Sequence, residues 1–168
     1  MSSLTLEDRT KRLLWMSFDV DGVLTDGGLF YGESGEVFKR FNALDGHGIK
    51  QLQGCGVGVL IISGRSHPSV NARAKELGIG EVIQDAGDKL AALRIWLDGK
   101  GVDPMQVGHM GDDLPDLSVF KAVGFAASVP NAHPDILEHA HWVSKRAGGN
   151  GAVRELCDLI LHSKGRDV

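Results

Sequence analysis

The sequence predicts an α/β fold in which helices cover a doubly wound, parallel β-sheet. Its 168 residues, 42% of them hydrophobic, suit a single domain with a substantial core. Short apolar runs alternate with segments of helical periodicity, as in parallel sheets whose strands are joined by crossover helices. The first apolar run, residues 13–18, stops at Asp19, Asp21 and Gly22, as expected where a buried strand ends in a loop.

The predicted elements follow one another in a regular order. After the first strand, alternating runs at residues 29–31 and 36–41 flank a Gly-Glu-Ser-Gly turn and predict a β-hairpin. Further strands are predicted at residues 57–62, 81–83, from residue 107, and at 123–127 and 142–143. Helices are predicted at residues 48–54, 68–77, 90–100, 114–123, near Pro134, and at 153–162. No repeat or low-complexity linker interrupts this order, so residues 1–168 are interpreted as one domain with a hairpin flap at about residues 27–41.

Charge and composition limit the possible partners. A net charge of −4 gives no reason to expect binding to nucleic acid or to an anionic membrane surface. No apolar run is long enough to span a membrane, and the polar residues 2–12 lack the apolar core of a signal peptide. Cys55 and Cys157 lie far apart without metal-ligand spacing, so we expect reduced thiols in a cytoplasmic protein.

Two carboxylates lie one residue apart at the end of the first strand. The carboxyl end of a strand is where open α/β sheets place their chemistry. Asp19 and Asp21 repel each other unless a cation or a shared proton relieves the repulsion. Mg²⁺ relieves it, because this ion takes oxygen ligands and keeps water or phosphate oxygens in its coordination shell. The sequence therefore predicts a magnesium site at this position.

Three later segments carry further polar residues at predicted strand or helix ends. Ser63 closes the β-branched run at residues 57–62 and precedes Gly64 and Arg65. Lys89 opens a predicted helix, and the segment Gly-Asp-Asp-x-x-Asp at residues 111–116 follows the strand that begins at residue 107. Taken singly, such residues are commonly caps or surface groups. Their joint placement at strand ends favours a catalytic site.

The four segments resemble, in the same order, the four motifs of the haloacid dehalogenase superfamily of aspartate-nucleophile phosphatases. The resemblance implies that Asp19 attacks phosphorus and that Asp21 acts first as general acid and then as general base. It implies that Ser63 and Lys89 stabilise charge on the phosphoryl oxygens.

The same resemblance implies a set of metal ligands. Mg²⁺ is expected to bind the Asp19 carboxylate, the Asp21 backbone carbonyl and the Asp112 carboxylate. Asp113 is expected to interact with the ion through water or through its direct ligands. Asp116 is expected to orient its neighbours or to cap the helix after Pro115.

Motif spacing leaves no room for the cap domain that members of this superfamily usually carry. Ser63 follows Asp19 by 44 positions, enough for the hairpin and one helix, and Lys89 follows Ser63 by 26. Without a cap, the phosphate site is open to water, which weakens its electrostatic interactions. We therefore expect a homo-oligomer in which the hairpin of one subunit covers the site of its neighbour.

Further segments resemble one capless family, the 3-deoxy-D-manno-octulosonate 8-phosphate phosphatases of lipopolysaccharide inner-core synthesis. They are residues 41–48, Gly64-Arg65 with Arg73, and residues 147–155, and the similarity runs from about residue 14 to 161. The resemblance implies a homotetramer and a small phosphorylated sugar acid as substrate, which requires cationic groups. The residues expected to bind it are Asp21, Asn42, Asp45, Gly46, Gly64, Arg65, Arg73, Lys89 and Arg154.

Two departures from the family pattern leave an alternative substrate open. Leu44 and Asn150 stand where many members carry basic residues, so a nine-carbon sugar acid 9-phosphate is the nearest alternative. His47 is a further candidate for substrate contact. A receiver-type phosphoacceptor domain is a distant alternative, and motif order argues against it, because receivers place their acid pair first and lack an acid two residues beyond the acceptor aspartate.

Overall fold

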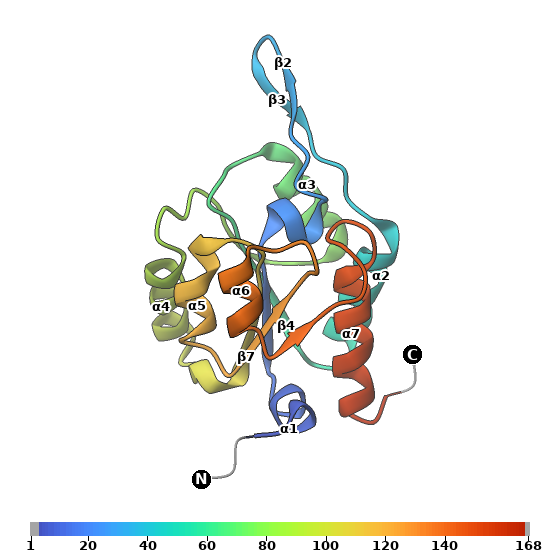
Figure 1. The fold of residues 1–168 in the computed structure, drawn as a ribbon, viewed down its shortest axis with the longest axis vertical. Coiled ribbons are helices and arrows are strands. Elements are labelled where there is room, and N and C mark those ends of the chain that lie inside the picture. Colours follow the sequence, from blue (N-terminus) through green and yellow to red (C-terminus); the bar gives the residue numbers. More distant parts are fainter. Residues whose placement is uncertain (1–3, 167–168) are drawn as a thin grey trace.

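A parallel sheet flanked by helices forms the centre of the molecule (Figure 1). The sheet has six strands in the order β5-β4-β1-β6-β7-β8. The structure, a computed structural model, describes residues 4–166. The strands are β1 (Trp15–Phe18), β4 (Gly58–Ile62), β5 (Glu81–Ile83), β6 (Val107–Met110), β7 (Phe125–Ser128) and β8 (Trp142–Val143). Because the chain runs from β1 to β4 and β5 on one side and returns to β6 on the other, the strand order reverses between β1 and β6. Ligand sites of open α/β sheets lie at the carboxyl ends of the strands beside such a reversal.

Helices cover both faces of the sheet, because successive side chains of β4 point to opposite faces and the side chains on both faces are apolar. Val59 and Ile61 pack into one apolar cluster, whereas Leu60 and Ile62 pack into another on the opposite face. The first cluster includes side chains from α2 (Ala43–Gly54), α3 (Pro68–Leu77) and α7 (Ala152–Ser163), and the second from α4 (Lys89–Lys100) and α5 (Leu117–Phe120). Burial of both faces explains the uninterrupted apolar character of this strand.

Local capping decides where the helices begin. The Asn42 side chain accepts a hydrogen bond from Leu44 N at 2.8 Å and begins α2, and the Asp88 side chain accepts from Ala91 N at 3.0 Å and begins α4. This cap makes Lys89 the first residue of α4.

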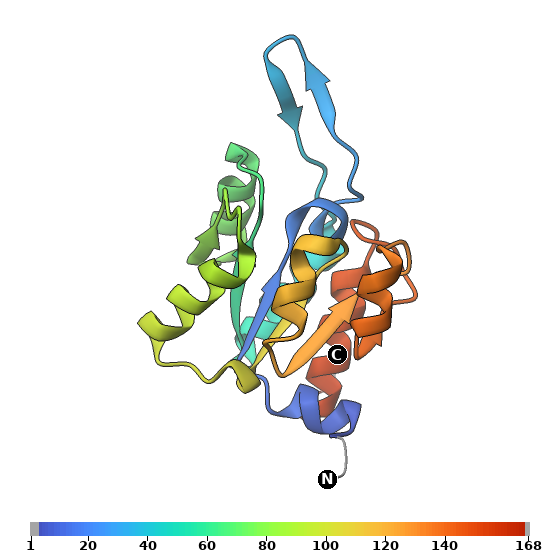
Figure 2. The same cartoon turned by 60° about the vertical axis from the view of Figure 1, so that its left-hand side comes forward.

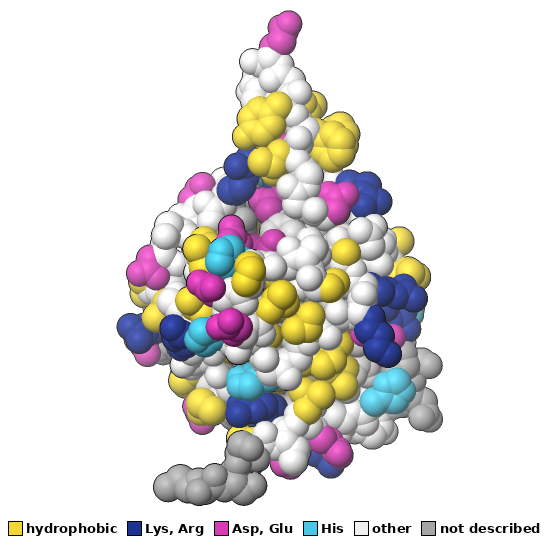
Figure 3. Space-filling view, in the orientation of Figure 1, with side chains coloured by type: hydrophobic (Ala, Val, Ile, Leu, Met, Phe, Trp, Pro, Cys, Tyr) yellow, Lys and Arg dark blue, Asp and Glu magenta, His cyan; other side chains and the backbone are white. Residues whose placement is uncertain are grey.

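A β-hairpin projects well beyond the body of the molecule (Figure 2). It consists of β2 (Phe30–Gly32) and β3 (Gly35–Phe38), as the sequence predicted. The rings of Phe30 and Phe38 stack with their centroids 4.4 Å apart. Apolar side chains remain on the outside of the hairpin (Figure 3). The exposed ones are Leu29, Phe30, Tyr31, Val37 and Phe38.

The predicted doubly wound sheet is confirmed, and no cap domain separates the motifs within residues 4–166. The predicted helix at residues 114–123 is wrong: the segment divides into η3 (Leu114–Asp116) and the short α5. The predicted strand at 123–127 begins only at Phe125, because Gly124 N bonds backward to the Pro104 and Val107 carbonyls.

One further helix begins at another residue than predicted, and one helix was not predicted. The second predicted helix begins earlier, at Ala43, because the Asn42 cap lies upstream of its apolar positions. A helix that the sequence did not predict, α1 (Leu6–Lys11), is begun by a reciprocal cap between Thr5 and Asp8. The remaining elements are η1 (Val20–Leu24), η2 (Pro104–Gln106) and α6 (Pro134–His139). Of the helices within residues 4–166, none combines the length and the apolar character needed to cross a membrane.

Candidate active site

One polar pocket at the carboxyl edge of the sheet brings together residues from all four sequence motifs. It lies where β1, β4 and β6 end and where α4 begins. The predicted site residues that line it are Asp19, Asp21, Ser63, Gly64, Arg65, Lys89, Asp112, Asp113 and Asp116, with Gly27 and Pro115 completing the wall.

The loop after β1 positions Asp19 against Asp112. Asp19 N donates to Met110 O at 2.9 Å, which joins the end of β1 to the end of β6. Gly22 follows with φ of +91°, and the Asp112 carboxylate occupies the space that a Cβ at this position would need. Glycine is thus required at position 22 both for its backbone angle and for the close approach of Asp112.

Lys89 is held between two buried carboxylates. Its Nζ lies 2.8 Å from Asp19 Oδ1 and 2.7 Å from Asp116 Oδ1. Burial opposes the charged ammonium, yet the two carboxylates raise the pKa of Lys89 above its ordinary value. Lys89 therefore remains a fixed positive charge beside Asp19.

The carboxylates of the site carry more negative charge than Lys89 compensates. Burial, and then the charge of Asp116, raise the pKa of Asp19 to about 6. Burial, and then the charges of Asp19 and Asp116, raise the pKa of Asp112 to about 7. Such an excess of buried negative charge is what a divalent cation relieves.

The geometry fits a metal ion held chiefly by Asp19 and Asp112. Oxygen atoms of Asp19, Asp112 and Asp116 all lie within 4.8 Å of one another. The oxygens of Asp116 already accept hydrogen bonds from Lys89, His109 and the backbone N–H groups of Asp112 and Asp113. Asp19 and Asp112 are the carboxylates of this group left to bind a hard cation such as Mg²⁺.

Asp21 is oriented by residues from the base of the hairpin. Lys39 Nζ lies 2.6 Å from Asp21 Oδ1 and 2.7 Å from Glu36 Oε1. Arg65 Nε lies 3.6 Å from Asp21 Oδ2, while its Nη2 donates to Glu36 Oε2 at 2.8 Å and to Tyr31 Oη at 3.1 Å. Asp21 Oδ2 is buried and accepts no hydrogen bond within the part of the chain that the structure describes.

Sequence reasoning missed Lys39 and Glu36 as parts of this site. The two residues are three apart in the predicted hairpin run at residues 36–41, where charged residues are common, and Lys39 directly follows β3. The available signal was a Lys–Glu pair within the predicted flap, and burial of Lys39 becomes evident only in the folded chain.

Ser63 lines the pocket at the end of β4. The residue is buried, and its Oγ accepts a hydrogen bond from Arg65 N at 3.2 Å. Its backbone is fixed to the neighbouring strand and loop by Ser63 N to Ile83 O and by Ala86 N to Ser63 O. The hydroxyl hydrogen is thereby left to donate to a phosphate oxygen.

Asp113 and Asp116 cap η3 reciprocally. The Asp113 side chain accepts from Leu114 N at 2.8 Å, and Asp116, fully buried, accepts from the backbone of Asp112 and Asp113. The Asp116 side chain therefore takes part in the cap of η3 and makes no cap hydrogen bond to α5, the helix after Pro115. Its expected role in orienting its neighbours stays a prediction. The expected contact of Asp113 with the ion through water stays a prediction.

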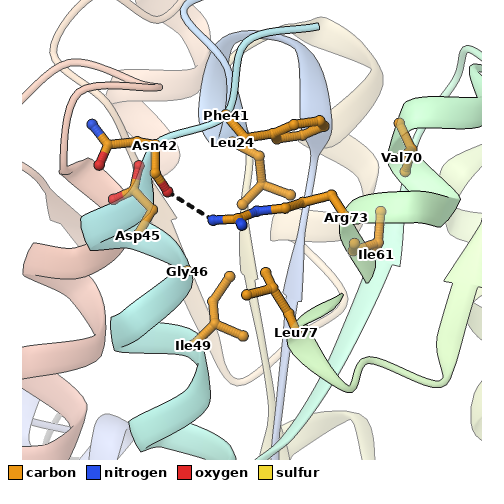
Figure 4. Close-up of a pocket in the computed structure, with 10 residues that line it drawn as sticks. All are labelled: Leu24, Phe41, Asn42, Asp45, Gly46, Ile49, Ile61, Val70, Arg73 and Leu77. Atoms are coloured by element: carbon orange, nitrogen blue, oxygen red, sulfur yellow. Dashed lines mark hydrogen bonds between the residues drawn. The ribbon is translucent and has the colours of Figure 1, made fainter. Parts of the chain in front are cut away.

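The remaining predicted substrate residues do not line this pocket. Asn42, Asp45, Gly46 and Arg73 line a second, smaller and mainly apolar pocket (Figure 4). There Arg73 Nη2 donates to Asn42 O at 3.0 Å, and its guanidinium lies where a side chain at Gly46 would be. Arg73 belongs to α3, and its side chain points toward the start of α2 (Figure 4).

Arg154 and the two departures from the family pattern also lie elsewhere. Arg154 Nε pairs with Asp158 at 2.6 Å, and Arg154 N donates to the buried carboxylate of Asp45 at 2.8 Å. Leu44 is exposed, and the Asn150 side chain accepts from Arg40 at 3.2 Å. His47 is exposed on α2, outside the polar pocket. A role for these residues in substrate binding stays a prediction.

A buried carboxylate beside a lysine, a serine hydroxyl and a carboxylate cluster suited to Mg²⁺, all at the switch point of a parallel sheet, define the class of aspartate-nucleophile phosphatases. A family model for haloacid dehalogenase-like hydrolases matches residues 77–156. The 3-deoxy-D-manno-octulosonate 8-phosphate phosphatase of Yersinia pestis is 46% identical over 85% of this chain and 76% of its own length. The enzyme of Escherichia coli K12 is 39% identical over 94% of this chain and 84% of its own. The chain belongs to the family of 3-deoxy-D-manno-octulosonate 8-phosphate phosphatases.

A solved structure from this family supports the same assignment. The phosphatase from Moraxella catarrhalis, in complex with magnesium, phosphate and a KDO molecule, superposes with a TM-score of 0.92 at 40% identity. The match covers 95% of this chain and 91% of that one. The comparisons favour neither the receiver-type alternative nor the nine-carbon alternative.

Proposed function

We propose that this chain is a Mg²⁺-dependent phosphoric monoester hydrolase that converts 3-deoxy-D-manno-octulosonate 8-phosphate to the free sugar acid and phosphate. The observation that carries the proposal is the placement of the Asp19 carboxylate against Lys89 in a pocket that also holds Asp21 and Ser63. The chain's similarity to the curated family members over most of its length supports the choice of substrate.

The first half-reaction transfers the phosphoryl group to the protein. An oxygen of Asp19 forms a bond to phosphorus while the bond between phosphorus and the sugar C8 oxygen breaks. Asp21, in its protonated form, gives its proton to the departing oxygen, and Lys89 and Ser63 stabilise charge on the phosphoryl oxygens. Mg²⁺, held by Asp19 and Asp112 and by the predicted backbone carbonyl of Asp21, would supply further charge neutralisation.

The second half-reaction restores the enzyme. Asp21, now ionised, takes a proton from a water molecule whose oxygen attacks phosphorus, and the bond between Asp19 and phosphorus breaks. Lys39 and Arg65 hold the side chain of Asp21 in place for both steps, because both cations lie against its carboxylate.

Arg65 and Gly64 contribute to recognition of the sugar acid at the mouth of the pocket. The Arg65 side chain is 42% exposed and lies at the junction of hairpin and pocket, where it is able to meet a substrate carboxylate. Asn42, Asp45, Gly46, Arg73 and Arg154 act on the same substrate less directly, through the fold or through the assembled oligomer. Substitution of Arg73 and of Arg154 tests whether these residues contribute to substrate recognition.

The experiment that tests the function is phosphate release measured across a panel of substrates with Mg²⁺. The panel contains 3-deoxy-D-manno-octulosonate 8-phosphate, a nine-carbon sugar acid 9-phosphate, neutral hexose phosphates and p-nitrophenyl phosphate. We expect the highest kcat/KM for the first of these. A higher value for a hexose phosphate would refute the substrate assignment and leave the phosphatase assignment standing, while a higher value for the nine-carbon substrate would favour that alternative.

The chain works as a homotetramer of single-domain subunits with the hairpin, about residues 27–41, as a flap. Five apolar side chains lie exposed on this projecting hairpin, the element that the sequence predicted to meet a neighbouring subunit. The two free cysteines, Cys55 and Cys157, support placement in the cytoplasm. Light scattering at assay concentration tests the tetramer, and a fully active monomer would contradict it.

A further inference from the structure

A buried row of polar side chains lies behind the Asp19–Lys89 pair. His109 on β6 is fully buried, and its partner across the parallel ladder is Ser17 on β1. Ser17 Oγ lies 2.7 Å from His109 Nδ1, and Asp116 Oδ1 lies 2.8 Å from His109 Nε2. Lys89 then joins Asp116 to Asp19, so the row runs from the middle of the sheet to the nucleophile.

The surroundings of Asp116 decide the direction of these hydrogen bonds. Its Oδ1 accepts from the Lys89 ammonium, and its Oδ2 accepts from Asp112 N at 3.3 Å and Asp113 N at 3.4 Å. A carboxylate surrounded by donors acts as an acceptor, so His109 Nε2 carries a hydrogen and donates it. Ser17 Oγ, which also contacts Gly108 O at 3.1 Å, fixes the other side of the ring.

We infer that His109, held by Ser17, is a positioning residue for phosphoryl transfer, acting through Asp116 on Lys89 and on the loop that carries Asp112. Lys89 is shared at nearly equal distance between Asp19 and Asp116. The hydrogen bond from His109 satisfies part of the Asp116 Oδ1 acceptor capacity and fixes the carboxylate plane. Without it, Asp116 competes more strongly for Lys89 and draws the ammonium away from the nucleophile.

The inference depends on the phosphatase chemistry proposed above but not on the identity of the sugar. It predicts a loss of kcat beyond any effect on stability, because His109 is connected to Lys89 and Asp19 through Asp116. Replacing a residue that served only packing would change the melting temperature without this loss of kcat. The ring does also pack edge-on against Phe120, with centroids 6.0 Å apart, so a packing effect has to be controlled.

The test compares His109→Leu with His109→Gln, whose amide nitrogen replaces the Nε2 donor. We expect His109→Leu to lower kcat by about tenfold or more and to change KM by less than about threefold. We expect His109→Gln to keep kcat within about threefold of the native enzyme. Each is measured with 3-deoxy-D-manno-octulosonate 8-phosphate and with p-nitrophenyl phosphate, so that failure of the sugar assignment is seen separately from failure of this inference.

Val107→Ala is the matched control, because Val107 is a fully buried residue of the same strand that packs in the apolar cluster of α4. It should lower the melting temperature and leave kcat within about twofold. A kcat for His109→Leu near the native value, or an equal loss in His109→Gln, would overturn the inference. An equal loss of kcat in Val107→Ala would do the same.

Two further measurements keep the inference testable under other outcomes. Calorimetric binding of inorganic phosphate in the presence of Mg²⁺ should weaken in His109→Leu and not in His109→Gln, and unchanged binding in His109→Leu would count against the inference even if no substrate were hydrolysed. If His109→Leu does not fold, Ser17→Ala replaces it, with an expected loss of about two- to fivefold in kcat. Native kcat in Ser17→Ala would then overturn the inference.

Discussion

Lys39, which directly follows the last strand of the hairpin, places its ammonium nitrogen 2.6 Å from the carboxylate of Asp21. The Lys39 side chain is 1% exposed, although it comes from the base of an arm that projects into solvent. Glu36 pairs with the same nitrogen at 2.7 Å and with Arg65 at 2.8 Å. The position of the hairpin is therefore coupled to the orientation of Asp21, which is proposed to act as both general acid and general base.

Replacing Lys39 by Met should slow turnover by roughly tenfold or more, because Asp21 loses the contact that orients it. The variant should also be less stable, by about 3 kcal/mol, since Asp21 and Glu36 lose the cation between them. Phosphate-release assays and denaturant unfolding measure the two effects. Arg40→Met is the control. Arg40 directly follows Lys39 and forms an exposed ion pair with Asp26, so its replacement should change kcat by less than about twofold. Native kcat in Lys39→Met would show that Asp21 needs no orientation from the hairpin.

Replacing Asp19 by Asn should reduce kcat by a factor on the order of a thousand or more, because the nucleophile is lost. The fold should persist, and the metal-free variant should melt no lower than the native protein, since burial and Asp116 already disfavour a charge at this position. Phosphate release and thermal unfolding are the measurements. Mass spectrometry of the quenched native enzyme should locate phosphate on Asp19, and phosphate on a different residue would contradict the mechanism.

Replacing Asp112 by Ala should raise the Mg²⁺ concentration needed for half-maximal activity by more than about tenfold, because it removes one of the two carboxylates suited to the ion. Activity in the native enzyme should disappear with a chelator and return when Mg²⁺ is added. Asp113→Ala removes the neighbouring carboxylate, which caps η3, and should have a smaller effect. A Mg²⁺ titration curve that is the same in Asp112→Ala and the native enzyme would remove Asp112 from the ligand set.

The stability of the metal-free protein should fall as pH rises between the ordinary carboxyl pKa of 3.8 and about 7, because the pKa of Asp112 is raised to about 7. A group whose pKa is higher in the folded state than in the unfolded chain favours folding at low pH, and this contribution is lost as pH rises through the folded value. Asp112→Asn should remove most of the decline above about pH 6, leaving the part due to Asp19, whose pKa is about 6. Denaturant unfolding in the presence of a chelator at several pH values measures the decline in stability for the native protein and the variant. An equally steep decline in Asp112→Asn would disprove this origin.

Replacing Arg73 or Arg154 by Ala should lower kcat/KM for the sugar acid phosphate by about tenfold or more relative to a neutral sugar phosphate. Arg73→Ala should also destabilise the fold, because the Arg73 side chain is only 17% exposed and its guanidinium bonds to the Asn42 carbonyl. The measurement is the ratio of kcat/KM for the two substrates. Arg94→Ala, at an exposed position of α4, should leave that ratio unchanged. An equal loss on both substrates would mean that these arginines support the fold and not recognition.

The sequence by itself determined the order of the strands, the order of most helices (α1 excepted), the four motifs and the hairpin. These features depend on local properties: two-residue alternation, caps such as Asn42 and Asp88, and the glycine at position 22. Because the carboxyl ends of parallel strands share one edge, locating Asp19, Ser63 and Asp112 at strand ends was enough to place them in one pocket.

The tertiary structure alone decided which charged groups meet. Lys39 reaches Asp21 because it lies at the base of the hairpin, beside the loop that follows β1, and His109 meets Ser17 because β6 pairs with β1 in one particular register. Arg73 bonds to the Asn42 carbonyl because α2 and α3 pack on the same face of the sheet. Such contacts join residues far apart in the chain, so they depend on strand register and helix packing, which local sequence patterns do not specify.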